Sequence, residues 1–163
     1  MYLFLIIEKA KKWMGHKYYR SKIQGKKETL AMKGTISIVS PQKITVGANC
    51  CINDGVQIHA GGGITLGNNV TVSMGAKLIT RSYDTHDWYE QCQKNEYDKN
   101  HIEKSIFLND HTWIGAGAIV LPGVHITGKG VIISAGTVIS KYIEEDYVLG
   151  AGSPAKIIKY YPH

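Results

Sequence analysis

The residues best suited to proton transfer lie between Thr80 and Ser105, in the polar stretch RSYDTHDWYEQCQKNEYDKNHIEK, where His86 stands between Asp84 and Asp87. A neutral imidazole accepts a proton in the physiological pH range, and a neighbouring carboxylate can fix its tautomer. The plain alternative is a surface histidine beside two turn-forming aspartates. The pattern therefore gives a candidate general base, and either aspartate could orient it.

A repeat of six residues forms the scaffold on both sides of this stretch. Large aliphatic residues recur at six-residue steps, with one step of seven before Ile133: Val46, Ile52, Ile58; Leu66, Val72, Leu78; Leu108, Ile114, Val120, Ile126; Ile133, Ile139. This period suits short strands joined by tight corners and stacked in coils, each with one large side chain inward. A β-sandwich would instead alternate at period two.

The repeat predicts an all-β parallel β-helix over residues 34–159, followed by a tail at 160–163. Residues 80–105 interrupt it as a protruding loop. A long insertion that a repetitive scaffold does not need is where function usually resides.

Residues 1–33 form a basic N-terminal segment in which Leu3, Ile6, Ile7, Ala10, Trp13, Met14 and Tyr18 have helical spacing. That spacing predicts an amphipathic helix from Leu3 to about Ile23. The helix could lie on an anionic membrane surface as a peripheral contact, or it could cap the β-domain, and capping is the favoured interpretation. Its apolar run is too short for a membrane span, and no nucleic-acid motif accompanies the positive charge.

The cysteines Cys50, Cys51 and Cys92 are odd in number and lack a CxxC spacing. They favour free thiols in a reducing compartment over disulfides or a zinc site. Because no small-residue cleavage site follows the short apolar start, we expect no signal peptide and a cytoplasmic protein.

The hexads, with WIGAGAIVLPGVHI, SAGTVISK and GAGSPAKIIK, resemble the hexapeptide-repeat acyltransferases, and within them the galactoside, maltose and bacterial polysaccharide O-acetyltransferases. The resemblance runs from near Ser37 to Lys159. It implies a left-handed β-helix with an N-terminal helix, a homotrimer, and acetyl-CoA as co-substrate in a groove between subunits, with no metal.

The same resemblance assigns expected roles to individual residues. In SYDTHDW it makes His86 the catalytic base and Asp87 its partner, with Asn53, Asp84 and Trp88 at the acceptor. Positions expected to contact acetyl-CoA are Trp113, Ala116, Ala135, Ser140, Lys141, Lys156 and Lys159. The alternatives without a functional role are a left-handed corner for Asn53, an interface aromatic for Trp113, and ordinary surface charge for the lysines.

The expected reaction is acetyl transfer to a hydroxyl of a saccharide or lipid-linked saccharide, such as a surface-polysaccharide precursor. An amino sugar would make it an N-acetyltransferase. A zinc enzyme like the γ-class carbonic anhydrases is a third possibility, because His59, His101, His111 and His125 are available. The segment SMGAKLI lacks the histidine that this class needs, so zinc ranks lower. A non-catalytic scaffold is disfavoured by the loop histidine His86 and by the SPAKIIK tail.

Overall fold

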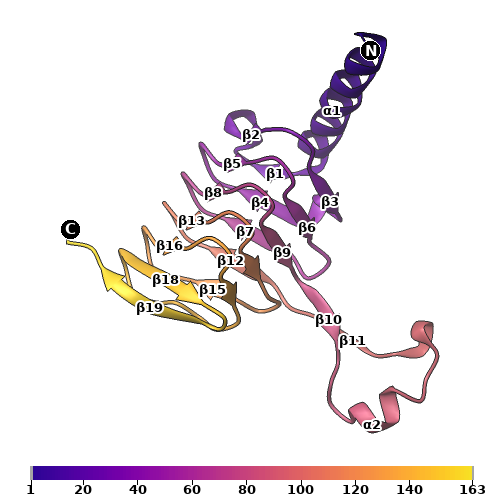
Figure 1. Ribbon diagram of the computed structural model, residues 1–163, viewed down its shortest axis with the longest axis vertical. Helices are drawn as coiled ribbons and strands as arrows, with labels where there is room; N and C mark the ends of the chain where they lie inside the picture. The colour runs from indigo at the N-terminus through magenta and orange to yellow at the C-terminus, as the bar shows by residue number, and fades with distance from the viewer. Residues whose placement is uncertain (1, 163) are drawn as a thin grey trace.

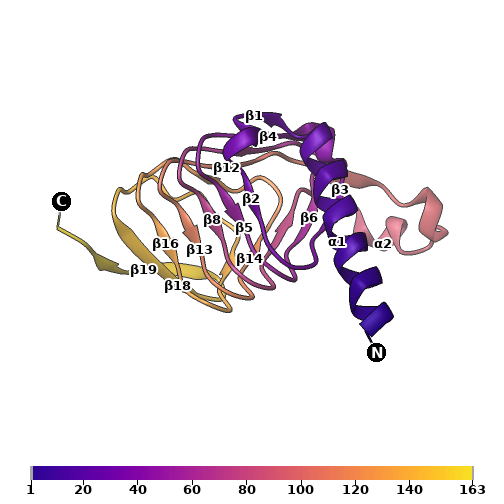
Figure 2. The same ribbon diagram turned by 90° about the horizontal axis from the view of Figure 1, so that it is seen from above.

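The computed structural model describes residues 2–162, with the backbone alone at residues 2–5 and 8. After one long helix the chain winds into a three-sided prism (Figures 1 and 2). Each side is a parallel sheet with one strand from every coil. Because a coil visits the three sides in turn, residues far apart in sequence stack directly above one another.

The elements have the following bounds. Sheet A holds β1 (Gln24–Gly25), β4 (Ile44–Val46), β7 (Ile64–Leu66), β12 (Ile106–Leu108) and β15 (His125–Ile126). Sheet B holds β2 (Ala31–Met32), β5 (Cys51–Ile52), β8 (Thr71–Val72), β13 (Trp113–Ile114), β16 (Ile132–Ile133), β18 (Val148–Gly152) and the antiparallel β19 (Ala155–Tyr160). Sheet C holds β3 (Ser37–Val39), β6 (Gln57–His59), β9 (Lys77–Ile79), β14 (Ile119–Val120) and β17 (Val138–Ile139). A hairpin of β10 (Arg81–Tyr83) and β11 (His101–Glu103) stands apart, and the helices are α1 (Tyr2–Lys22), α2 (Trp88–Gln91), η1 (Lys27–Thr29), η2 (Pro41–Lys43) and η3 (Glu96–Asp98).

The core is the inside of the prism, and the predicted period is confirmed. Every large aliphatic residue of the six-residue repeat is buried, with at most 3% of its surface exposed. In sheet A, Val46 pairs with Leu66, Leu66 with Leu108, and Leu108 with Ile126, so the side chains form a continuous ladder. No single coil could bury its apolar residues without its neighbours.

Positive-φ backbone at the corners accounts for many of the glycines and asparagines of the repeat. Where sheet B turns into sheet C, Gly75 has φ +69, a conformation open to glycine at little cost. Where sheet A turns into sheet B, Asn49, Asn69 and His111 occupy the left-handed region at φ 58, 56 and 62. His111 is therefore a corner residue, in a position that asparagine fills in earlier coils.

The first coil begins earlier than the expected boundary at residue 34. Strand β1 already pairs with β4, and β2 with β5. Ile23 and Leu30 close the end of the core at 1% and 2% exposure. Residues 24–33 thus belong to the prism, because their apolar side chains plug its open end.

Helix α1 confirms the expected N-terminal helix and projects from that end of the prism (Figure 1). Over residues 2–162, no helix is long and apolar enough to cross a membrane. The three cysteines are free thiols, and burial raises the pKa of the Cys50 thiol.

Candidate active site

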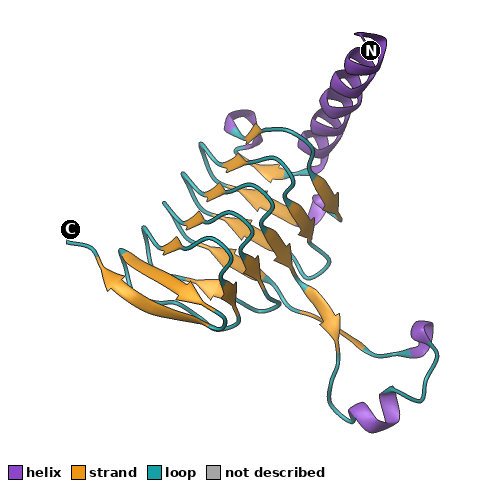
Figure 3. Ribbon diagram, in the orientation of Figure 1, coloured by secondary structure: helices purple, strands orange, loops and turns teal. Residues whose placement is uncertain are grey.

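The loop carrying His86 leaves the prism between β9 of sheet C and β12 of sheet A. Strands β10 and β11 form an antiparallel stalk in which Ser82 pairs with Ile102. Short helices form the far end of the loop (Figure 3). The insertion is therefore an ordered arm whose stalk is hydrogen-bonded.

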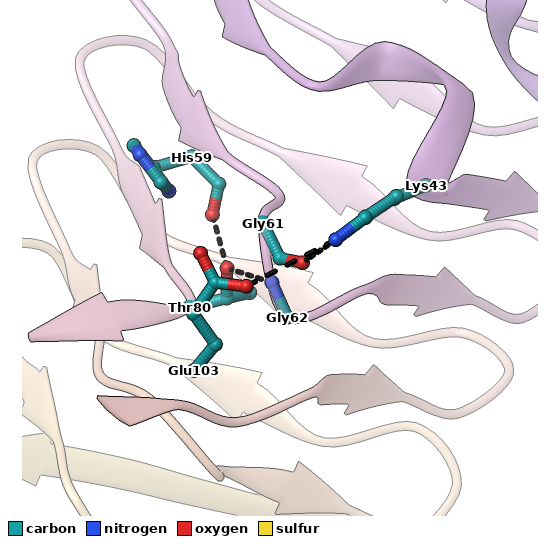
Figure 4. Close-up of polar contacts among 6 residues, drawn as sticks. All are labelled: Lys43, His59, Gly61, Gly62, Thr80 and Glu103. Atoms are coloured by element: carbon teal, nitrogen blue, oxygen red, sulfur yellow. Dashed lines mark hydrogen bonds and ion pairs between the residues drawn. The ribbon is translucent and has the colours of Figure 1, made fainter. Parts of the chain in front are cut away.

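A polar network fastens this stalk to the coils (Figure 4). Thr80 is fully buried, and its Oγ1 donates to the His59 carbonyl at 2.6 Å and accepts from the Gly62 N–H at 2.9 Å. Lys43 Nζ donates to the Gly61 carbonyl at 2.5 Å and lies 3.9 Å from Glu103 Oε2. Both strands of the stalk are thus tied to the corner of the preceding coil.

The far part of the loop has its own contacts. The Tyr83 ring lies 4.7 Å from that of His101 and 6.3 Å from that of Trp88, between centroids. Gln91 is buried, and its Oε1 accepts from the Asn100 N–H at 3.1 Å. These contacts join the two halves of the loop on either side of His86.

His86 itself is held by both neighbouring aspartates, in different ways. Its Nδ1 lies 2.7 Å from Asp87 Oδ2, while its backbone N–H donates to Asp84 Oδ1 at 3.0 Å. A carboxylate accepts hydrogen bonds, so in the neutral imidazole Nδ1 carries the proton and Nε2 keeps a lone pair. The His86 side chain is 82% exposed and that of Asp87 63%, so in one chain the pair lies in water.

Asn53 and three of the expected acetyl-CoA contacts lie along the edge between sheets B and C. Asn53 follows β5 and donates from Nδ2 to the Val72 carbonyl at 3.0 Å. It is not among the described residues with positive φ, so the left-handed corner interpretation is wrong. Trp113 is 49% exposed, and its Nε1–H donates to Ser73 Oγ at 2.8 Å. Ala116 and Ala135 are exposed on successive coils of this edge.

The remaining expected residues lie elsewhere. Ser140 and Lys141 follow β17, at the edge between sheets C and A where the His86 loop also emerges. Lys156 and Lys159 are exposed on β19 at the C-terminal end of sheet B. Sheet C therefore separates the edge that carries Asn53 and Trp113 from the edge that carries His86.

Comparison with known proteins bears directly on this prism and its loop. The family model described as hexapeptide repeat of succinyl-transferase matches residues 44–78 and 109–141, on either side of the loop. The galactoside O-acetyltransferase of Lactococcus lactis is 32% identical over 109 residues, covering 67% of this chain and 46% of that protein. The chain belongs to the hexapeptide-repeat acyltransferase family.

Solved structures agree with this family assignment at the level of the fold. A hexapeptide-repeat acetyltransferase of Vibrio cholerae, complexed with acetyl-CoA, superposes with a TM-score of 0.75 at 22% identity, covering 89% of this chain and 75% of that one. A maltose O-acetyltransferase of Clostridium difficile gives 0.74 at 24% identity, covering 89% and 73%. The expected left-handed parallel β-helix is thereby confirmed. The chain spans about half the length of the curated relatives it matches, at 42%, 55% and 46% of the first three.

This hexapeptide-repeat protein also has a hollow of about 640 Å³ between sheet C and the loop stalk. Its polar lining residues are Ser37, Gln57, His59, Lys77, Arg81, Ser82, Tyr83 and His101. The sequence interpretation considered only His59 and His101 among these, as possible zinc ligands. The available signal was the outward-facing position beside each buried aliphatic residue of sheet C, which in β9 is Lys77.

The histidines considered for zinc are dispersed. Within residues 2–162, no three His, Cys, Asp or Glu side chains gather closely enough to hold a metal ion. His125 stacks on Tyr142 with ring centroids 5.0 Å apart, and His101 packs on Tyr83. These side chains have structural neighbours that account for their positions.

Proposed function

We propose that this chain transfers acetyl from acetyl-CoA to a saccharide hydroxyl, with His86 as the general base. The observation that carries the proposal is the His86–Asp87 pair, in which Nδ1 is engaged at 2.7 Å and Nε2 is left to accept a proton. The buried Thr80 network anchors the stalk of the arm that presents this pair. The relatives' names, which include galactoside O-acetyltransferase, support the reaction class.

The chemistry needs only one base and one oxyanion site. His86 Nε2 takes the proton of the acceptor hydroxyl while that oxygen attacks the thioester carbonyl. The tetrahedral oxyanion is stabilised by a backbone N–H of a coil, and its collapse breaks the C–S bond. The leaving thiolate recovers the proton from the imidazolium, which restores neutral His86 and releases CoA. Asp87 keeps the ring in the productive tautomer throughout.

The acetyl-CoA groove is completed by a second copy of the chain in a homotrimer. Asn53, Trp113, Ala116 and Ala135 line one edge of sheet C, while His86, Ser140 and Lys141 belong to the other. Bringing the two edges of neighbouring copies together would enclose the exposed His86–Asp87 pair. Lys156 and Lys159 then supply positive charge for the phosphates of acetyl-CoA. Asp84, Trp88 and Asn53 face the acceptor.

The compartment and the acceptor follow from this chemistry. The cytoplasm supplies acetyl-CoA and keeps the three free cysteines reduced. A lipid-linked or soluble precursor of a surface polysaccharide is the proposed acceptor.

The test measures thiol release from acetyl-CoA with a panel of sugars. Replacing His86 by Ala should lower acceptor-dependent release about 10²–10⁴-fold, the usual contribution of a general base. His111→Asn is the matched control, since asparagine fills the same corner at Asn49 and Asn69, and it should leave the rate unchanged. Normal turnover by His86→Ala would remove the mechanism.

The acceptor panel also separates the alternatives. Release that depends on sugars bearing free amines, and not on hydroxyl-only sugars, would make the protein an N-acetyltransferase. A chain that binds no acetyl-CoA would instead be a scaffold.

A further inference from the structure

Helix α1 exposes an apolar face that the prism leaves uncovered. Ile6, Ile7, Trp13, Met14 and Tyr18 are 50%, 44%, 63%, 55% and 55% exposed. At about 100° per residue, these five positions fall within about 140° of one another around the helix axis, so their side chains share one side of the helix. A continuous row of large apolar side chains in water is costly, and such rows usually mark a contact surface.

The helix attaches to the prism by its other side. His16 Nε2 lies 2.8 Å from the Gly34 carbonyl, the Tyr19 hydroxyl accepts from the Ile38 N–H at 3.4 Å, and Ile23 just beyond the helix is buried. The step of two residues from Met14 to His16 is a rotation of about 200° around a helix axis. Ile7, Met14 and Tyr18 therefore point away from the side that holds the prism, and capping the end of the core does not use them. Trp13 lies nearer the attached side, in a hollow that it shares with His16.

The positive charge around the apolar row of α1 indicates which kind of surface it binds. The helix contains one acidic residue, Glu8, and six basic ones: Lys9, Lys11, Lys12, Lys17, Arg20 and Lys22. Lys17 lies over the Trp13 ring, with Nζ 5.1 Å from its centroid. An apolar face bordered by lysines is the composition of helices that lie in the interface of anionic bilayers. Packing against the same helix of a second copy would bring these positive charges together.

We propose that α1 is a membrane-docking helix that lies flat in the surface of an anionic bilayer. Its 21 residues span about 30 Å, with the apolar row toward the acyl chains and the lysines at the headgroups. His16 and Tyr19 keep the prism attached to the side that faces away from the lipid. Docking does not depend on the acetyl transfer proposed above, and it would hold the enzyme beside a lipid-linked acceptor.

The test is flotation of the full chain with vesicles of phosphatidylcholine, alone or mixed with phosphatidylglycerol. We expect binding to the mixed vesicles and little to the neutral ones, with strong weakening by salt. Ile7→Gln with Met14→Gln should abolish flotation. Ile158→Gln, which removes an apolar residue that is 61% exposed on β19, should not change it.

A second pair of double variants tests how much the lysines of α1 contribute to vesicle binding. Lys9→Gln with Lys17→Gln should weaken binding to the mixed vesicles about fivefold per charge. Lys94→Gln with Lys129→Gln removes the same net charge away from the helix and should have little effect. Unfolding temperatures of all variants show whether the prism is intact, since none of the substituted side chains belongs to its core.

Several results would overturn the proposal. Equal binding to neutral and mixed vesicles would exclude selection of an anionic bilayer. Binding that survives Ile7→Gln with Met14→Gln would exclude docking through α1. Absence of flotation would do the same. If the wild-type chain instead associates further in solution, and the same substitutions abolish that association, the row is an interface between copies.

Discussion

Replacing Thr80 by Val tests how the loop that carries His86 is anchored, because valine keeps the shape of threonine and removes its hydroxyl. Thr80 is fully buried, so its Oγ1 is not replaced by water without rearrangement. The Gly62 N–H loses its 2.9 Å acceptor, and the His59 carbonyl loses its 2.6 Å donor. That carbonyl keeps the Thr80 backbone N–H at 3.0 Å, so Gly62 is the group left unpaired.

Two lost hydrogen bonds, each with a net contribution of about 0.5–1.5 kcal/mol, predict a stability loss of about 1–3 kcal/mol. For a chain of this length the unfolding temperature should fall by about 2–4 °C for each kcal/mol. Hydrogen exchange at the Gly62 amide should accelerate in Thr80→Val. Thr80→Ser, which keeps the hydroxyl, should preserve that protection. Wild-type protection of Gly62 in Thr80→Val would refute the proposed role of the hydroxyl.

Three further substitutions probe the prism. Ile114→Ala removes most of a fully buried side chain between Val72 and Ile133. The free energy of unfolding, measured in urea, should fall by about 2–5 kcal/mol, and by about 0.5–1.5 kcal/mol for Ile114→Val. Equal losses in the two variants would contradict the stacked aliphatic ladder. The Asn68 backbone N–H holds the pKa of Asp110 below its usual 3.8, so Asp110 stabilises the fold above that pH and less as the pH falls through the lower value. Asp110→Asn should therefore flatten the acid side of a plot of unfolding temperature against pH, and an unchanged slope would exclude this contribution. Gly75→Ala, at φ +69, should lower stability by about 1 kcal/mol, and a stabilised variant would show that the corner can relax.

The repeat was predictable because its signal is local. One inward side chain per six residues is imposed by strands that are two or three residues long between fixed corners, and Ile52, Val72 and Ile114 follow it over three coils. The start of the first coil gave no such signal. Ile23 and Leu30, which close the open end of the core, are seven residues apart.

The site was less predictable because its contacts depend on local backbone conformation and on residues distant in the sequence. Asp87 contacts the His86 ring, while Asp84 accepts from the His86 backbone N–H. This arrangement depends on the left-handed backbone of Asp87 at φ 55. The anchoring of the loop joins Thr80 to Gly62 across a corner, which no spacing in the sequence reveals. Likewise, the amphipathic pattern of α1 is the same whether its apolar face packs on the prism or points outward.

Subunit complementation tests the central claim most directly. One chain carries His86→Ala, the other Asn53→Ala with Trp113→Ala, and mixed oligomers are isolated through two different tags. If the site combines His86 of one copy with Asn53 and Trp113 of the next in a cyclic trimer, each mixed trimer contains one intact site and about one third of wild-type activity. Mixed oligomers as inactive as both parents would contradict a shared catalytic groove.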